Sequence, residues 1–361
     1  MKKLKLLLVS ILAVATLAGC ANTPPLEQKV TINAEPEQIA EKTDKAQVSA
    51  EEAKEEASGN EIVSENAASE NNAVQPVDIS FSDENMGSTT APAWTNVDEE
   101  KKKEPLKDED YAHRLNIYCL DADKADAFIL YSGNRNAVVI DCGKKKDGED
   151  ITEYLKEKGL DHVSALIITH FDKDHVGGAY EVIMNNDVEN VYTTYMSKSS
   201  KRIDDYNDAM ELRNKEEIVV RKEITFEVDG TTYQIIPAGK PDYAKDDSNN
   251  SSLVIKVTNG EHSMLFTGDA QEERISELVN RTDLKSEIIK MPHHGKYEAN
   301  LDFLLNAVRP KYAVITSSEK EPADPVTLKL LEQHNIKTYN TVDGDIEIEF
   351  IGDRTNITVD D

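Results

Sequence analysis

The sequence predicts an α/β domain in which two β-sheets form the core and helices flank them. Strand-like and helix-like patterns alternate from about residue 114 to residue 361. Sharp turn signals typical of β-hairpins recur at Asp229-Gly230, Asn259-Gly260 and Asp343-Gly344. Several of the apolar runs are immediately followed by residues whose side chains are of the types that bind metal ions. Hairpin-rich sheets mixed with helices are typical of a two-sheet core.

The predicted strands are short apolar runs that end at turn residues. They cover residues 115–120, 127–131, 137–140, 165–169, 287–291, 312–316 and 346–350. Helical patterns cover residues 151–158, 179–185, 204–213, 272–279, 301–308 and 325–334. Gly159 directly follows the first of these helices and suits its C-terminal cap.

Residues 1–20 have the pattern of a secretory signal. Lys2, Lys3 and Lys5 precede a short apolar stretch, and Leu-Ala-Gly precedes Cys20. The stretch is too short to favour a transmembrane helix. The block resembles a bacterial lipoprotein signal, in which the cysteine is lipidated and becomes the mature N-terminus; an ordinary cleaved signal is the alternative. We therefore expect an extracytoplasmic protein anchored to the membrane by lipid.

Residues 21–110 are rich in Glu, Ala, Asn, Ser and Thr, and contain few aromatic residues. Such a composition does not bury enough apolar surface to offset the entropy of the chain, so a disordered acidic linker is predicted. Charge repulsion would extend this linker as a tether. The remaining residues, 111–361, are long enough for one sizeable domain.

The densest group of ligand-type side chains follows the predicted strand at 165–169. His170, Asp172, Asp174 and His175 fall within six positions, and two glycines come next. Imidazole and carboxylate are the usual protein ligands of zinc and related divalent metals. Ligands of α/β proteins lie at the carboxyl ends of strands, which is where this loop is predicted. A polar surface loop with a chance cluster is the alternative.

Further ligand-type residues close other predicted strands: Asp141, Asp269, and the pair His293 and His294. Each could be a helix cap or a turn residue on its own. A single site supplied by several strand ends explains all of them.

Together these motifs resemble the ordered motifs of the metallo-β-lactamase fold. Within it, the sequence is most similar to the hydrolase domain of ComEC-type competence proteins, which carry an aspartate at the position of Asp172. Those proteins also have an Asn-Ser-Leu-Val strand start, similar to the segment from Asn250 to Val254, and a Pro-His-His-Gly block. The resemblance implies an αββα sandwich with a metal site between the sheet edges.

The resemblance also implies ligands for one or two metal ions. They are His170 and Asp172 for a first metal, Asp174 and His175 for a second, Asp269 as a bridge, and His293 or His294 to complete the site. Asp141 would orient the metal-binding loop from behind the ligands; a plain cap or turn is the alternative. Because the site is rich in carboxylates, manganese is an expected metal beside zinc.

The sequence departs from the family pattern in ways that bear on the metal count. No histidine lies between His175 and His262, so the first metal would depend on the amide oxygen of Asn249 or Asn250. One firmly held metal, bound by Asp174, His175, Asp269 and His293, is the alternative. The usual Asp-Val-Gly-Gln-Gly-Asp segment is replaced by Asp-Ala-Asp-Lys-Ala-Asp at 121–126.

These features predict a surface-anchored, metal-dependent hydrolase of phosphodiester bonds, with Asp174 and His175 as the catalytic pair. Asp174 would orient the nucleophilic water or accept its proton. The formal net charge of −28 gives little support to broad nucleic-acid binding, although a local basic groove is compatible with it. Single-stranded DNA, a small phosphodiester and a cell-wall phosphoester, such as a choline or teichoic-acid group, are the candidate substrates. A non-catalytic binding module in DNA uptake or envelope assembly is the alternative.

The cysteines do not form a disulfide framework, because the chain has only three of them. Cys119 lies in a predicted strand and Cys142 directly follows Asp141. They are expected to be small buried thiols, and a disulfide between them is the alternative.

Overall fold

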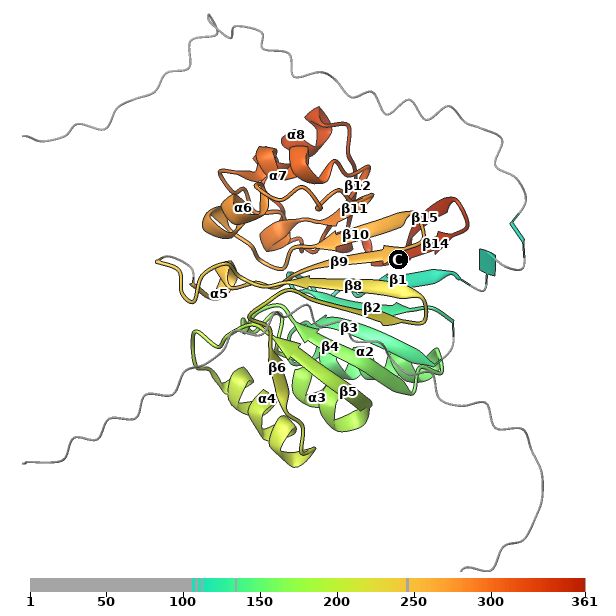
Figure 1. Ribbon diagram of the computed structural model, residues 1–361, viewed down its shortest axis with the longest axis vertical. Coiled ribbons are helices and arrows are strands. Elements are labelled where there is room, and N and C mark those ends of the chain that lie inside the picture. The colour runs from blue at the N-terminus through green and yellow to red at the C-terminus, as the bar shows by residue number, and fades with distance from the viewer. Residues whose placement is uncertain (1–105, 108–109, 112, 134, 245–246, 361) are drawn as a thin grey trace, which may run out of the picture. The chain divides into compact units, whose positions relative to one another are not determined.

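The computed structural model describes residues 106–107, 110–111, 113–133, 135–244 and 247–360. Two β-sheets stack face to face, and helices cover the outer face of each (Figure 1). This confirms the predicted αββα sandwich. The predicted signal with Cys20 and nearly all of the predicted linker at 21–110 lie outside the described residues.

The first sheet combines parallel strands with antiparallel ones. Its strands are β1 (Leu115–Cys119), β2 (Ala127–Tyr131), β3 (Asn136–Cys142), β4 (His162–Ile168), β5 (Asp187–Thr193), β6 (Glu217–Val219), β14 (Asp345–Ile351) and β15 (Arg354–Asp360). Their order within the described chain is β15-β14-β1-β2-β3-β4-β5-β6. Strands β3 to β6 are parallel, and the remaining pairs are antiparallel.

The second sheet is built in the same way. Its strands are β7 (Ile224–Val228), β8 (Thr231–Ile236), β9 (Val254–Asn259), β10 (His262–Phe266), β11 (Ile288–Lys290), β12 (Tyr312–Ile315) and β13 (Lys337–Asn340). They are ordered β13-β12-β11-β10-β9-β8-β7 in the part of the chain that is described. Strands β7 to β10 are antiparallel and β10 to β13 are parallel.

Helices cover both sheets. Over the first sheet lie α2 (Asp147–Glu157), α3 (Ala179–Asn185) and α4 (Lys201–Leu212), and over the second lie α6 (Glu272–Leu278), α7 (Leu301–Val308) and α8 (Pro325–Gln333). Three shorter turns are α5 (Asp247–Asn250), η1 (Pro292–Gly295) and η2 (Thr341–Asp343). None of the described helices is both long and apolar enough to cross a bilayer.

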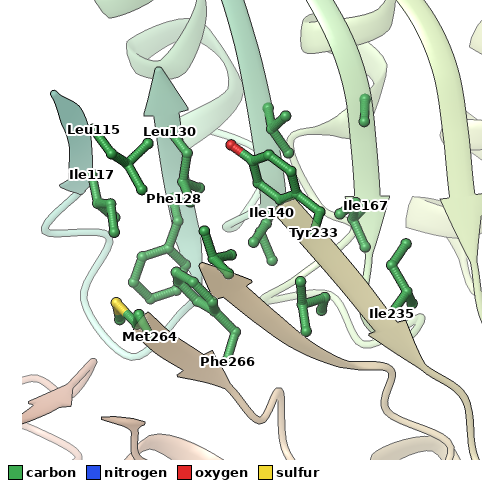
Figure 2. Close-up of a cluster of buried hydrophobic side chains, with 14 of the residues drawn as sticks. Leu115, Ile117, Phe128, Leu130, Ile140, Ile167, Tyr233, Ile235, Met264 and Phe266 are labelled. Atoms are coloured by element: carbon green, nitrogen blue, oxygen red, sulfur yellow. The ribbon is translucent and has the colours of Figure 1, made fainter. Parts of the chain in front are cut away.

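The core between the sheets is built from large side chains that alternate along the facing strands (Figure 2). Phe128 from β2 and Phe266 from β10 meet edge to face, with ring centroids 5.0 Å apart. Tyr233 stacks on Phe226, with centroids 5.2 Å apart. Burying a side chain of this size contributes about 1.5–3 kcal/mol. The Phe128–Phe266 contact therefore helps to hold the two sheets together, while the Phe226–Tyr233 stack joins neighbouring strands of the second sheet.

Two of the three predicted hairpins are confirmed and one prediction is wrong. Asp229-Gly230 joins β7 to β8, and Asn259-Gly260 joins β9 to β10. At Asp343-Gly344 the chain instead leaves the second sheet and enters the first, where β14 pairs with β1 and β15. Gly344 has a φ of 126°, so this turn needs a glycine although no hairpin forms there.

The predicted cysteine alternatives are resolved. Cys119 on β1 and Cys142 on β3 are both buried, free thiols. Burial raises the pKa of both thiols well above the ordinary value. Both therefore act as small apolar residues of the core.

Candidate metal centre

The ligand-type residues meet at one edge of the sandwich, because they follow strands that run in parallel within each sheet. Asp141 lies near the end of β3, and His170 follows β4. Asp269 follows β10, His294 follows β11, and Thr316 follows β12. The carboxyl ends of parallel strands share an edge, so residues far apart in the sequence are brought into one place.

Asp269 lies at the centre of a group that we call the His–Asp269 cluster, made of His170, His175, His294 and Asp269. Its Oδ2 is 3.1 Å from Nε2 of His294 and 4.0 Å from Nε2 of His170. Its Oδ1 is 3.3 Å from Nε2 of His175. All three imidazoles therefore present the same ring nitrogen to one carboxylate.

The opposite ring nitrogens of His175 and His170 are held by one buried carboxylate. Asp141 accepts hydrogen bonds from Nδ1 of His175 at 2.8 Å and from the Thr169 hydroxyl at 2.7 Å. Since that hydroxyl gives its single proton to Asp141, its oxygen accepts from Nδ1 of His170, 3.1 Å away. Both histidines thus carry a proton on Nδ1, and the Nε2 atom of each faces the cluster.

A second relay of the same kind holds His294. The Thr316 hydroxyl donates to Oδ1 of Asp126 at 2.7 Å and accepts from Nδ1 of His294 at 3.0 Å. Lys290, fully buried, places its ammonium 2.6 Å from Oδ2 of Asp126. The negative charge of Asp126 is therefore compensated inside the protein, and Nε2 of His294 also faces the cluster.

The atoms that face the cluster have unmet bonding capacity. Nε2 of His170, His175 and His294 and Oδ1 of Asp269 are buried, yet none makes a hydrogen bond within the described residues. Buried polar atoms without partners are rare in proteins and indicate an unseen ion or ligand. Three oriented imidazoles and a carboxylate are a donor set that suits a divalent cation.

Two overlapping sets of ligand atoms are close enough to share a metal ion, because the atoms within each set lie within 4.8 Å of one another. The first set is His170, His175 and Asp269, and the second is Asp174, His175 and His294. A third set, Asp126, Asp141 and His175, is compatible with a metal by distance alone. In that set the Nδ1 of His175 is already bonded to Asp141. The third set is therefore the support behind the cluster, and the first two are the candidate sites.

Electrostatics keep the cluster ready for a cation. Burial, together with the charge of His175, lowers the pKa of His170 to about 3, so this imidazole is neutral. Burial alone would raise the pKa of Asp269, but His294 and His175 outweigh it and hold that pKa well below the ordinary value. Against the effect of burial, the charge of Asp269 raises the pKa of His175 and of His294, so a cation bound at Nε2 of these two histidines would replace a proton there.

Asp172 is less available as a metal ligand than its place in the motif predicts. One of its oxygens contacts both the Lys198 ammonium and the Ser248 hydroxyl. The same oxygen is 3.9 Å from Nε2 of His170. Asp172 belongs to neither of the candidate sites defined by distance, so its role as a first-metal ligand stays a prediction.

Two further predicted residues lie outside the cluster. The amide oxygen of Asn250 accepts from the backbone N–H groups of Gln271 and Arg274, at 3.2 and 3.1 Å, and so stabilises the start of α6. The ring of His293 lies 3.2 Å from Glu298, and the structure places His294 at the cluster instead. The alternative set with His293 stays a prediction, and the groups of ligand atoms that lie close together contain His294.

The reason lies in the backbone of η1. His293 and His294 both have positive φ, 48° and 56°. Two successive left-handed residues send their side chains in different directions, which the sequence pattern alone does not reveal.

Four residues that hold the cluster residues in place were not predicted from the sequence: Asp126, Thr169, Lys290 and Thr316. A signal was present for each. Thr169, Lys290 and Thr316 lie at or just beyond the ends of buried strands, as the predicted ligands do. Asp126 is the aspartate retained at the end of the altered segment 121–126. A charged side chain within the apolar run of β11 was the clearest of these signals.

The fold and this site define a class of protein. The sequence profile of the metallo-beta-lactamase superfamily matches residues 121–317, and the chain belongs to that superfamily. That family and the His–Asp269 cluster together imply a divalent metal.

Three curated proteins are similar in sequence. ComE operon protein 3 of Bacillus subtilis is 27% identical over 52% of this chain and 24% of its own length. Recombination protein 2 of Haemophilus influenzae is 27% identical over 62% of this chain and 27% of its own. Competence protein ComA of Neisseria gonorrhoeae is 24% identical over 61% of this chain and 30% of its own. The chain thus spans under a third of these relatives.

Among solved structures, the metallo-beta-lactamase fold protein YhfI of Bacillus subtilis is 11% identical, with a TM-score of 0.42. The match covers 63% of this chain and 95% of that one.

Proposed function

We propose that the protein is a metal-dependent hydrolase of phosphodiester bonds. The observation that carries this proposal is the convergence of three imidazole Nε2 atoms on Asp269, each ring held by hydrogen bonds behind it. Holding these groups in place leaves buried polar atoms without partners, which costs free energy unless an ion binds them.

Zinc or manganese would be held by His170, His175, His294 and Asp269, with Asp174 beside them. A bound divalent cation supplies Lewis acidity, which strengthens water as a nucleophile near neutral pH. The chain's own residues supply orientation: Asp141 holds His175, and the relay through Thr316 holds His294.

Asp174 is the residue placed to handle a proton. Its carboxylate retains 13% exposure, and its Oδ2 is 3.8 Å from Nε2 of His294. It therefore lies between the buried cluster and solvent. In this position it would orient a nucleophilic water or accept its proton, as predicted for a general base.

The choice of phosphodiesters rests on the relatives. The names of two of them refer to recombination and to competence. Recombination acts on DNA, whose backbone is a chain of phosphodiesters. A cell-wall phosphoester is the second candidate substrate, because the proposed location is the outer face of the membrane.

That location rests on the first 20 residues. We propose that Cys20 carries the lipid, that residues 21–110 form the tether, and that residues 111–361 form the hydrolase. Incorporation of labelled palmitate tests the anchor, and Cys20→Ser should abolish it. Label that persists in Cys20→Ser would overturn this part of the proposal.

The catalytic proposal is tested with a double variant. Metal analysis of the purified protein should find zinc or manganese, and bis(4-nitrophenyl) phosphate should be hydrolysed. Asp174→Ala with His175→Ala should abolish turnover. The matched control is His162→Ala with Asp187→Ala, a His–Asp pair of 2.8 Å at the opposite end of β4. Equal activity in the two double variants would contradict the proposal.

A non-catalytic binding module is the second candidate, and one observation favours it. Lys198 and Ser248 already contact Asp172, which leaves the first predicted metal position poorly supplied with ligands. This function predicts that ligand binding survives removal of metal. Full binding of an oligonucleotide after treatment with a chelator would support the module, and loss of binding would support the hydrolase.

A further inference from the structure

Three lysines contact carboxylates at or beside the His–Asp269 cluster, and their exposure separates them into two kinds. Lys290 is fully buried and compensates Asp126, so it belongs to the support. The side chain of Lys124 is 15% exposed, and that of Lys198 is 38% exposed. Lys124 and Lys198 both reach solvent from positions beside the candidate ligands, so either can contact a bound substrate as well.

Lys124 and Lys198 contact different candidate ligands. Lys198 contacts Asp172, whose carboxylate is 3.9 Å from Nε2 of His170. Lys124 has its ammonium 3.7 Å from Oδ2 of Asp174, which is 3.8 Å from Nε2 of His294. Oδ2 of Asp269 is 4.0 Å from Nε2 of His170 and 3.1 Å from Nε2 of His294. Each ammonium group therefore lies beside a different histidine of the cluster.

The two lysines come from different parts of the first sheet. Lys124 lies in the loop between β1 and β2, within the altered segment 121–126. Lys198 lies between β5 and α4. Asp174 belongs to a candidate metal site, and Asp172 is a predicted ligand of the first metal. A carboxylate that shares its charge with a divalent cation attracts a neighbouring ammonium less strongly. A metal held by Asp174 would therefore make Lys124 available to another anion, and a metal held by Asp172 would do the same for Lys198.

We propose that Lys124 and Lys198 form two anion subsites that bind the phosphates on either side of the bond to be hydrolysed. The inference rests on the proposed function and narrows its substrate to an oligomeric phosphodiester. A chain of phosphates supplies one negative charge for each lysine. A single choline ester carries a positive group instead, which an ammonium beside the cluster repels.

The overall charge makes such local subsites necessary. With a formal net charge of −28, the protein repels polyanions at long range. Binding of a phosphate chain therefore needs cationic groups next to the reacting position, where screening by salt is incomplete over a few ångströms.

The experiment compares Lys124→Met and Lys198→Met with the unmodified full-length protein. Methionine keeps most of the side-chain length and removes the charge. Lys337→Met is the matched control, because Lys337 lies on β13 over the ring of Tyr339 and contacts no cluster residue. The substrates are a short oligothymidylate and a glycerol-phosphate oligomer, which distinguish nucleic acid from a wall polymer as the source of the phosphates.

We expect each cluster-side variant to raise the KM for the cleaved oligomer about tenfold, with a smaller change in kcat. Binding of a phosphorothioate oligomer gives a readout that needs no turnover. The slope of log affinity against log salt should fall by about 0.7 for each lysine removed. Metal content should equal that of the unmodified protein.

The outcomes separate this inference from the proposed function. Unchanged KM and unchanged salt slope in both variants would overturn the lysine subsites, even if the small diester is still hydrolysed. A failure of the unmodified protein to hydrolyse any diester would overturn the proposed function, and the phosphorothioate binding would still decide the role of the lysines. Loss of metal in either variant would also contradict the inference.

Discussion

Asp141→Asn is the most informative single change, because it replaces a carboxylate oxygen by an amide NH2 group at nearly the same size. Asp141 is fully buried and accepts three hydrogen bonds, from the backbone N–H and hydroxyl of Thr169 and from Nδ1 of His175, all between 2.7 and 2.8 Å. Asparagine has nearly the same size and tolerates the φ of 56° at this position.

The expected loss of metal affinity follows from the number of hydrogen-bond donors that surround residue 141. An asparagine amide turned toward His175 presents a donor to Nδ1 and forces the proton onto Nε2, which must be free to bind metal. If the amide turns the other way, two donors meet at the backbone N–H of Thr169. Either arrangement leaves one buried mismatch of about 1–3 kcal/mol. We therefore expect metal affinity to fall about 10–100-fold, as for other residues that orient metal ligands.

The assay is a competition titration of the full-length protein against a chromophoric chelator. Asp229→Asn is the matched control, because Asp229 also has a positive φ, 47°, but lies in the exposed hairpin between β7 and β8. Its metal affinity should be unchanged. If Asp141→Asn bound zinc as tightly as the control does, the relay behind His175 would not set the metal-binding tautomer.

Further predictions concern stability. The Glu287 hydrogen bond of 2.7 Å raises the pKa of His262, and His262, against the effect of burial, lowers the pKa of Glu287. The His262 contribution is complete below about pH 6.5 and is lost at higher pH, while that of Glu287 is lost as pH falls below about 4.3. In urea unfolding, His262→Gln should therefore cost more at pH 5.5 than at pH 9, and an equal loss would contradict the pairing. Phe266→Ala should lower the free energy of unfolding by about 3–5 kcal/mol, and a loss below about 1 kcal/mol would show that the sheets repack. Gly178→Ala should reduce the yield of folded protein, because its Cβ would lie 2.4 Å from the Cys142 carbonyl oxygen; a normal melting temperature would refute that.

The layered architecture could be predicted from the sequence because it depends on local patterns. The boundaries of α3 and α7 match the predicted helices, since apolar periodicity and turn residues define them. The destination of the chain after Asp343-Gly344 could not be predicted, because a turn signal gives the local geometry and not the sheet that the next strand joins.

The candidate metal centre also combines features that could be predicted from the sequence with features that could not. Clustering of His170, His175 and Asp269 was predictable from strand ends, since parallel strands bring their carboxyl ends together. The choice of His294 over His293 was not, because it depends on two unusual backbone angles. Likewise, the capture of Asp172 by Lys198 is a contact between distant loops, which no local pattern encodes.

The return of β14 to pair with β1 has a consequence for biosynthesis. Arg114 and Glu349, joined by an ion pair across that seam, are separated by 235 positions. A ribosome adds about 5–20 residues each second, so the first strand waits on the order of tens of seconds for its neighbour. During that interval β1 presents an unsatisfied edge, and contacts of such long range are slow to form once the chain is complete. Nascent molecules released before residue 345 would therefore lack the strand that closes the sheet, and we expect them to be targets for proteolysis.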